Sequence, residues 1–75
     1  MPKLPAVTPK KLIKVLEAMG FVKLRSKGSH FFFVHKDGRK TVVPMHGKDL
    51  PKGTFSAILK DIQITAEVFT EIMKK

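Results

Sequence analysis

The first regular pattern along the chain is helical, with apolar residues recurring three and four positions apart. Thr8 and Pro9 form a typical N-cap and first-turn pair, and Gly20 supplies a stop signal. Together these signals predict a helix from about Pro9 to Met19. The apolar face of this helix is formed by Leu12, Val15, Leu16 and Met19.

An alternating pattern follows and predicts three short strands. Residues 21–26 alternate in the manner of a strand with one face in water. Residues 30–36 are rich in β-forming side chains, and residues 39–43 return as their antiparallel partner until a proline ends the strand. Between them, Asp37 and Gly38 form a two-residue hairpin signal. In the first strand the two alternating sets are Phe21, Lys23 and Arg25 against Val22 and Leu24.

Two further helices are predicted after the strands. Residues 45–50 form a loop, and Pro51 to Thr54 open a helix with one apolar face. Thr65 has the character of another N-cap and precedes a short amphipathic helix. The apolar positions are Phe55, Ile58, Leu59 and Ile62 in the first of these helices and Val68, Phe69, Ile72 and Met73 in the second.

The predicted order is helix, three strands and helix, with a short extra C-terminal helix. This order indicates an α+β fold in which a three-stranded antiparallel sheet carries its helices on one face, as in the double-stranded-RNA-binding fold. No internal repeat, low-complexity tract or linker divides residues 1–75, so we expect a single domain. Because one fold serves many activities, the order alone names no function.

Composition narrows the chemistry that this domain can carry. The 75 residues include no cysteine, and the three histidines lack the close spacing that is typical of zinc ligands. We therefore expect no metal and no cofactor. The apolar runs are too short to cross a bilayer, and the N-terminal stretch has no signal-peptide core. The expected location is cytoplasmic, without a membrane partner.

The charge balance points to an anionic partner. The chain has 15 Lys and Arg residues against 6 Asp and Glu, a formal net charge of +9 at pH 7. Counterions released from phosphates give such a chain affinity for nucleic acid. An anionic membrane surface is the lesser alternative, and ordinary solvated lysine-rich faces would also account for the charge.

Strand parity separates the side chains around His30. Side chains alternate along a strand, so one face holds His30, Phe32 and Val34 and the other holds Phe31, Phe33 and His35. If the second set packs under the helices, His30 points to the open face and His35 is a half-exposed residue at the strand end. An imidazole on the open face can take a proton from the 2′-hydroxyl of RNA, a route that needs no metal. Phe32 beside it is a stacking platform for an unpaired nucleotide, a cover for the sheet edge or a protein contact.

Three segments resemble successive blocks of a known family. They are LIKVLEAMGF, GSHFFFVHKDGRKTVVP and KDLPKGTFSAILKDI, which together cover roughly Lys11 to Thr65. The chain is thereby similar to the HicA family, small toxin ribonucleases of bacterial and archaeal toxin–antitoxin pairs. The most specific parts of the resemblance are Gly20, the Gly28-Ser29-His30 triplet, the strand end Thr41-Val42-Val43-Pro44 and the Gly53-Thr54 pair.

The resemblance implies an mRNA interferase, an endoribonuclease that binds and cleaves mRNA and whose essential histidine falls on His30. It also implies a HicB-like antitoxin as the inhibitor. Gln63 stands where the family usually ends the second helix with glycine, and Phe31 and Phe32 stand where polar residues often follow the histidine. A left-handed Gln63 would cost about 1 kcal/mol relative to glycine.

Several residues near His30 are candidate RNA contacts. Lys48 and Lys52 precede the second predicted helix, whose N-terminus favours phosphate. Arg25, Lys27 and Lys48 are candidates to stabilise charge on the reacting phosphate. The alternative functions are a noncatalytic RNA-binding module of the same fold and a basic adaptor for an acidic protein. The full set of candidate RNA contacts is Arg25, Lys27, Ser29, Phe32, His46, Lys48 and Lys52.

Overall fold

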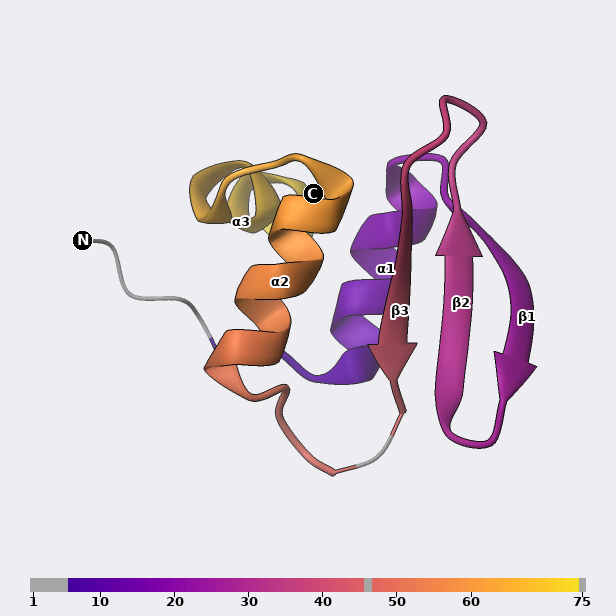
Figure 1. Cartoon of the computed structure of the whole chain (residues 1–75). Coiled ribbons are helices and arrows are strands. Elements are labelled where there is room, and N and C mark those ends of the chain that lie inside the picture. The colour runs from indigo at the N-terminus through magenta and orange to yellow at the C-terminus, as the bar shows by residue number, and fades with distance from the viewer. Residues whose placement is uncertain (1–5, 46, 75) are drawn as a thin grey trace.

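The computed structural model describes residues 6–45 and 47–74 and has the element order α-β-β-β-α-α (Figure 1). This order confirms the predicted α+β fold with a short C-terminal helix. Within the described residues, no helix is long and apolar enough to cross a membrane. The elements are the helix α1 (Pro9–Ala18), the strands β1 (Val22–Lys27), β2 (His30–Val34) and β3 (Lys40–Pro44), and the helices α2 (Lys52–Ile62) and α3 (Ala66–Lys74).

The three strands form one antiparallel sheet in the order β1-β2-β3, with β2 in the centre. The helices gather next to β3, and β1 lies farthest from them (Figure 1). Phe33, Thr41 and Val43 are buried against the helices, and Phe31 packs partly buried on the same side. His30 has the opposite parity and is exposed. The predicted division of β2 into a helix-facing side and an open side is therefore confirmed.

One hydrophobic core joins the helices to β2 and β3. By contrast, all six residues of β1 are exposed, so this strand does not have the half-buried character that its alternation predicts. The strand is held by its pairing with β2. The buried core consists of Val7, Leu12, Val15, Leu16, Phe21, Phe33, Val43, Leu50, Phe55, Ile58, Leu59, Ile62 and Phe69.

Local sequence signals set the helix ends as predicted. The hydroxyl oxygen of Thr8 accepts a backbone N–H from the first turn of α1 at 3.2 Å, and that of Thr65 accepts one from α3 at 3.1 Å. Both threonines are therefore N-caps. Gly20 follows α1 with a φ of +99°, and a Cβ there would lie 3.1 Å from Nε2 of His35. The turn after α1 thus favours glycine through both its backbone conformation and its close contact.

The turn between β2 and β3 is longer than the predicted two residues. His35 donates its backbone N–H to the carbonyl oxygen of Arg39 at 2.8 Å, which leaves residues 36–38 as a three-residue loop. Gly38, in the third position, has a φ of +100°, as three-residue hairpin loops require. β2 therefore ends at Val34, before the predicted strand end.

The end of α2 has a left-handed residue that carries a side chain. Gln63 has φ 59° and ψ 43°, and the N–H of Ile64 donates to the carbonyl oxygen of Leu59 at 3.2 Å, as in a glycine-type helix end. We expect Gln63→Gly to raise the free energy of unfolding by about 1 kcal/mol, because glycine has no Cβ strain there. Urea unfolding followed by circular dichroism measures the change. Gln63→Ala keeps the Cβ and is the control; a less stable glycine variant would contradict the prediction.

Candidate nucleic-acid interface

His30 begins β2 on the open face of the sheet, in a row with one residue from each neighbouring strand. Lys27 pairs with His30 from β1, and Pro44 pairs with it from β3. Residues that pair across antiparallel strands lie on the same face of the sheet. The pairings of Phe32 define the next row on this face. That second row consists of Arg25, Phe32 and Val42.

A β-bulge decides which face Arg25 occupies. Lys23 pairs with Phe33 on the helix side of the sheet, and the register then shifts. Arg25 pairs with Phe32 on the open side. The extra residue, Leu24, reverses the alternation that the sequence predicts, because one added residue turns every later side chain to the other face. The prediction that Arg25 shares a face with Lys23 is therefore wrong.

A hollow of about 510 Å³ adjoins His30 at one end of the sheet. Asp49 and Thr54 line it because the loop after β3 returns the chain to this end of β2. Asp49 is not a predicted site residue, whereas Thr54 lies at the helix start that is predicted to hold a phosphate. No spacing in the sequence signals that return. The residues that line the hollow are His30, Val42, Pro44, Gly47, Asp49, Pro51 and Thr54.

The remaining predicted RNA contacts are close in sequence to residues that line this hollow. The carbonyl oxygen of Ser29 accepts the N–H of Met45 at 2.6 Å, which ties the turn between β1 and β2 to the loop after β3. Lys48 and Lys52 are exposed and flank lining residues of the hollow. His46, the remaining candidate, lies outside the described residues.

The start of α2 has features that favour anions, although one carboxylate, that of Asp49, also lines the hollow beside it. Among the described residues, no side chain caps its first turn, and that turn has no acidic residue. The N–H groups and the dipole of such a helix start favour anions. Lys52 adds a charge at the first position of the helix. The three strands contain no aspartate or glutamate, so the sheet and the helix start together suit a polyanion.

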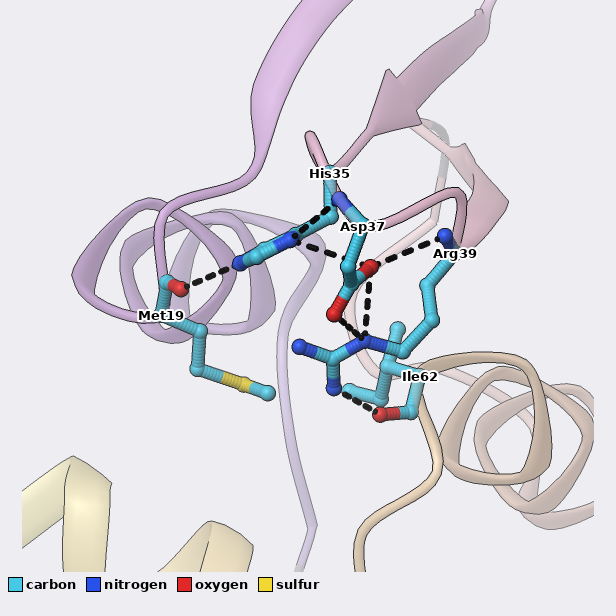
Figure 2. A network of polar contacts seen from close by, with 5 residues as sticks. All are labelled: Met19, His35, Asp37, Arg39 and Ile62. Atoms are coloured by element: carbon cyan, nitrogen blue, oxygen red, sulfur yellow. Dashed lines mark hydrogen bonds and ion pairs between the residues drawn. The ribbon is translucent and has the colours of Figure 1, made fainter.

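The second described histidine, His35, contacts the end of α1 and its own hairpin turn (Figure 2). In the neutral ring, Nδ1 accepts the backbone N–H of Asp37 at 3.1 Å, and Nε2 donates to the carbonyl oxygen of Met19 at 3.0 Å. Nδ1 also lies 3.0 Å from the carboxylate oxygen Oδ1 of Asp37, a contact that is an ion pair only when the ring is protonated. The side chain is only 12% exposed, and its ring packs edge-on against Phe21 with centroids 5.0 Å apart. His35 is therefore a structural residue, and the prediction that it is half-exposed is wrong.

The turn that holds His35 also holds Arg39 (Figure 2). The carboxylate of Asp37 accepts the backbone N–H of Arg39 at 3.0 Å and its Nε at 2.9 Å. The backbone hydrogen bond, followed by the side-chain hydrogen bond and the guanidinium charge, lowers the pKa of Asp37 below its ordinary value. Nη1 of Arg39 donates to the carbonyl oxygen of Ile62 at 2.6 Å. This turn thereby joins the ends of α1 and α2.

Comparison with known proteins identifies a family for the greater part of the chain. The model of a family described as the HicA toxin of bacterial toxin–antitoxin systems matches residues 9–64. The matched span includes every helix and strand except α3, and it contains His30 and the hollow beside it. No curated protein sequence matches the chain.

Proposed function

Because this chain belongs to the HicA toxin family of bacterial toxin–antitoxin systems, we propose that it is an endoribonuclease that binds and cleaves mRNA. The observation that supports this proposal best is the position of His30. Its side chain is exposed on the open face of the sheet and lines a hollow whose other wall is the start of α2. A phosphate held in that hollow lies beside an imidazole.

In the proposed mechanism, His30 is the general base and the RNA supplies the nucleophile. The imidazole takes the proton of a 2′-hydroxyl, the 2′-oxygen forms a bond to the adjacent phosphorus, and the bond from phosphorus to the 5′-oxygen breaks. The departing 5′-oxygen takes a proton from water, and His30 then gives the proton it accepted to the resulting hydroxide, so no proton is gained or lost overall. The products are a 2′,3′-cyclic phosphate and a 5′-hydroxyl, and the route calls for no metal or cofactor.

Cationic side chains are proposed to stabilise the negative charge that builds up on the reacting phosphate. Lys27 is paired directly with His30 across the sheet. Arg25 lies in the next row on the same face. Lys48 is next in sequence to residues that line the hollow. Lys27 is therefore the first candidate for transition-state stabilisation, with the other two acting on neighbouring phosphates.

The first test asks whether the purified chain cleaves RNA. A single-stranded RNA labelled at its 5′ end is incubated with the protein, and the product ends are examined for a 2′,3′-cyclic phosphate. The same oligonucleotide made entirely of deoxyribonucleotides lacks the nucleophile and is expected to stay whole. Binding of the RNA without cleavage would indicate the noncatalytic RNA-binding module instead, and neither binding nor cleavage would indicate a basic adaptor.

A second test locates the RNA at the start of α2. We expect the double variant Lys48→Ala/Lys52→Ala to bind single-stranded RNA more weakly, with the slope of log affinity against log salt reduced by about 1.4, because each lost phosphate contact releases about 0.7 fewer counterions. Fluorescence anisotropy across a salt series measures this slope.

The matched control for that test is Lys36→Ala/Lys60→Ala. Both of these lysines are exposed, but they lie in the hairpin turn and in the last turn of α2, away from the hollow. This control removes the same charge and should change the slope less. Equal slopes in the two double variants would place the RNA elsewhere.

The proposed partner protein is a HicB-like antitoxin that holds the toxin inactive, because toxins of the HicA family are paired with such inhibitors. Membership of a toxin–antitoxin family already implies an antitoxin partner. The proposed location is the cytoplasm, where mRNA is available. Co-expression of the chain with the product of the neighbouring gene, followed by growth measurements, tests both the toxicity and its neutralisation.

A further inference from the structure

Two side chains form a cation–ring contact on the open face of the sheet, one row away from His30. The guanidinium carbon of Arg25 lies 4.9 Å from the centroid of the Phe32 ring. Val42 completes the row from β3 and is 36% exposed. The row therefore places a guanidinium group over an aromatic ring, with an apolar side chain beside them.

This row lies close enough to His30, the proposed general base, to contact the same nucleotide. Phe32 and His30 are two positions apart on β2, a separation of about 7 Å along a strand. A nucleotide whose phosphate lies at His30 can therefore place its base over Arg25.

We propose that Arg25, supported by Phe32, is a stacking site for an unpaired base next to the phosphate that is cleaved. This inference rests on the proposed function and narrows its substrate to single-stranded RNA. Guanidinium planes and aromatic rings are the groups on which unpaired bases stack. The charge of the face also fits this ligand, because the strands that form it contain no acidic residue.

The sheet supplies its own control on the opposite face. Nζ of Lys23 lies 4.8 Å from the centroid of the Phe31 ring, so β1 carries two cation–ring contacts separated by the bulge. Lys23 lies on the helix side of the sheet, away from His30. Lys23→Ala and Arg25→Ala each remove one positive charge and one such contact from the same exposed strand, and only the second removes the proposed stacking plane.

The experiment uses a short oligodeoxynucleotide with one 2-aminopurine, whose fluorescence falls when the base stacks. The oligodeoxynucleotide lacks the 2′-hydroxyl, so binding is measured without cleavage. We expect the wild-type chain to quench the fluorescence on binding. Arg25→Ala should weaken binding by about 5- to 100-fold and remove most of the quenching. Lys23→Ala should weaken binding only by the loss of one charge and keep the quenching.

Two more variants separate stacking from charge and from folding. Arg25→Lys keeps the charge but not the planar group, and Phe32→Leu keeps apolar volume but not the ring; both should lose quenching. A thermal melt of each variant shows whether it is folded. If Arg25→Ala does not fold, the quenching measured with Arg25→Lys decides the test.

The outcomes distinguish this inference from the proposed function. Equal weakening in Arg25→Ala and Lys23→Ala with unchanged quenching would overturn the stacking site, as would a wild-type chain that does not quench the probe. A face that serves only a protein partner would give that second result. A chain that quenches the probe but never cleaves RNA would support the stacking site and contradict the proposed nuclease activity.

Discussion

Replacing His30 with alanine is expected to lower the rate of RNA cleavage by about 10²- to 10⁴-fold, the usual contribution of a general base. The fold should remain, because the side chain is exposed and the core is built from other residues. We expect the free energy of unfolding to change by less than about 1 kcal/mol. RNA affinity should fall only modestly, since phosphate contacts by lysine and arginine dominate it.

Cleavage and melting temperature are measured on the same His30→Ala sample in one buffer. Free imidazole added to that sample tests the chemistry directly, because it can enter the space left by the ring and restore part of the rate. Cleavage by the variant at the wild-type rate would contradict the proposal that His30 is the general base. A much lower melting temperature of the variant would indicate a structural role for His30 instead.

The helix ends of this protein are readable from sequence because they are decided within a few residues. Thr8 and Thr65 each accept a hydrogen bond from the turn that follows them, and the positive φ of Gly20 ends α1. Gln63 is left-handed without the glycine that usually relieves such a position. At Thr8, Thr65 and Gly20 the residue types carry this information, whereas at Gln63 only the family resemblance indicates the left-handed conformation, because glutamine is not typical of it.

The face of Arg25 is not readable in this way. Strict alternation places it with Lys23, but the register shift between them turns it to the open side of the sheet. A bulge depends on how two strands pair, and neither strand alone contains that information. The bulge matters for the proposed stacking site, because it places Arg25 over Phe32 and beside the row of His30.

The hollow beside His30 is likewise a product of the whole fold. Parity in β2 predicts the open-face position of the histidine, and the family resemblance singles it out. Asp49 and Thr54 reach it only because the loop after β3 carries the chain back toward the end of β2. The partners of His35 are equally distant, since Met19 lies 16 residues away in the chain. Such contacts follow from packing, which sequence patterns do not specify.

Replacing His35 with alanine is expected to have the opposite effect to replacing His30. The ring donates to the carbonyl oxygen of Met19 at the end of α1, a group that the helix itself leaves without a partner. It also packs against Phe21. Losing the hydrogen bond in a partly buried place and the ring contact should cost about 2–3 kcal/mol. For a domain of this size that cost lowers the melting temperature by roughly 10–20 °C.

Activity separates the two histidines. At a temperature where His35→Ala is still folded, we expect it to cleave RNA at close to the wild-type rate, because the hairpin turn lies at the opposite end of β2 from His30. His35→Gln, whose amide can still donate to the carbonyl, should recover part of the stability. A selective loss of cleavage with an unchanged melting temperature would contradict this assignment. The hairpin turn would then be part of the RNA site, since the structural contacts of His35 with Met19 and Phe21 predict a change in stability before any change in chemistry.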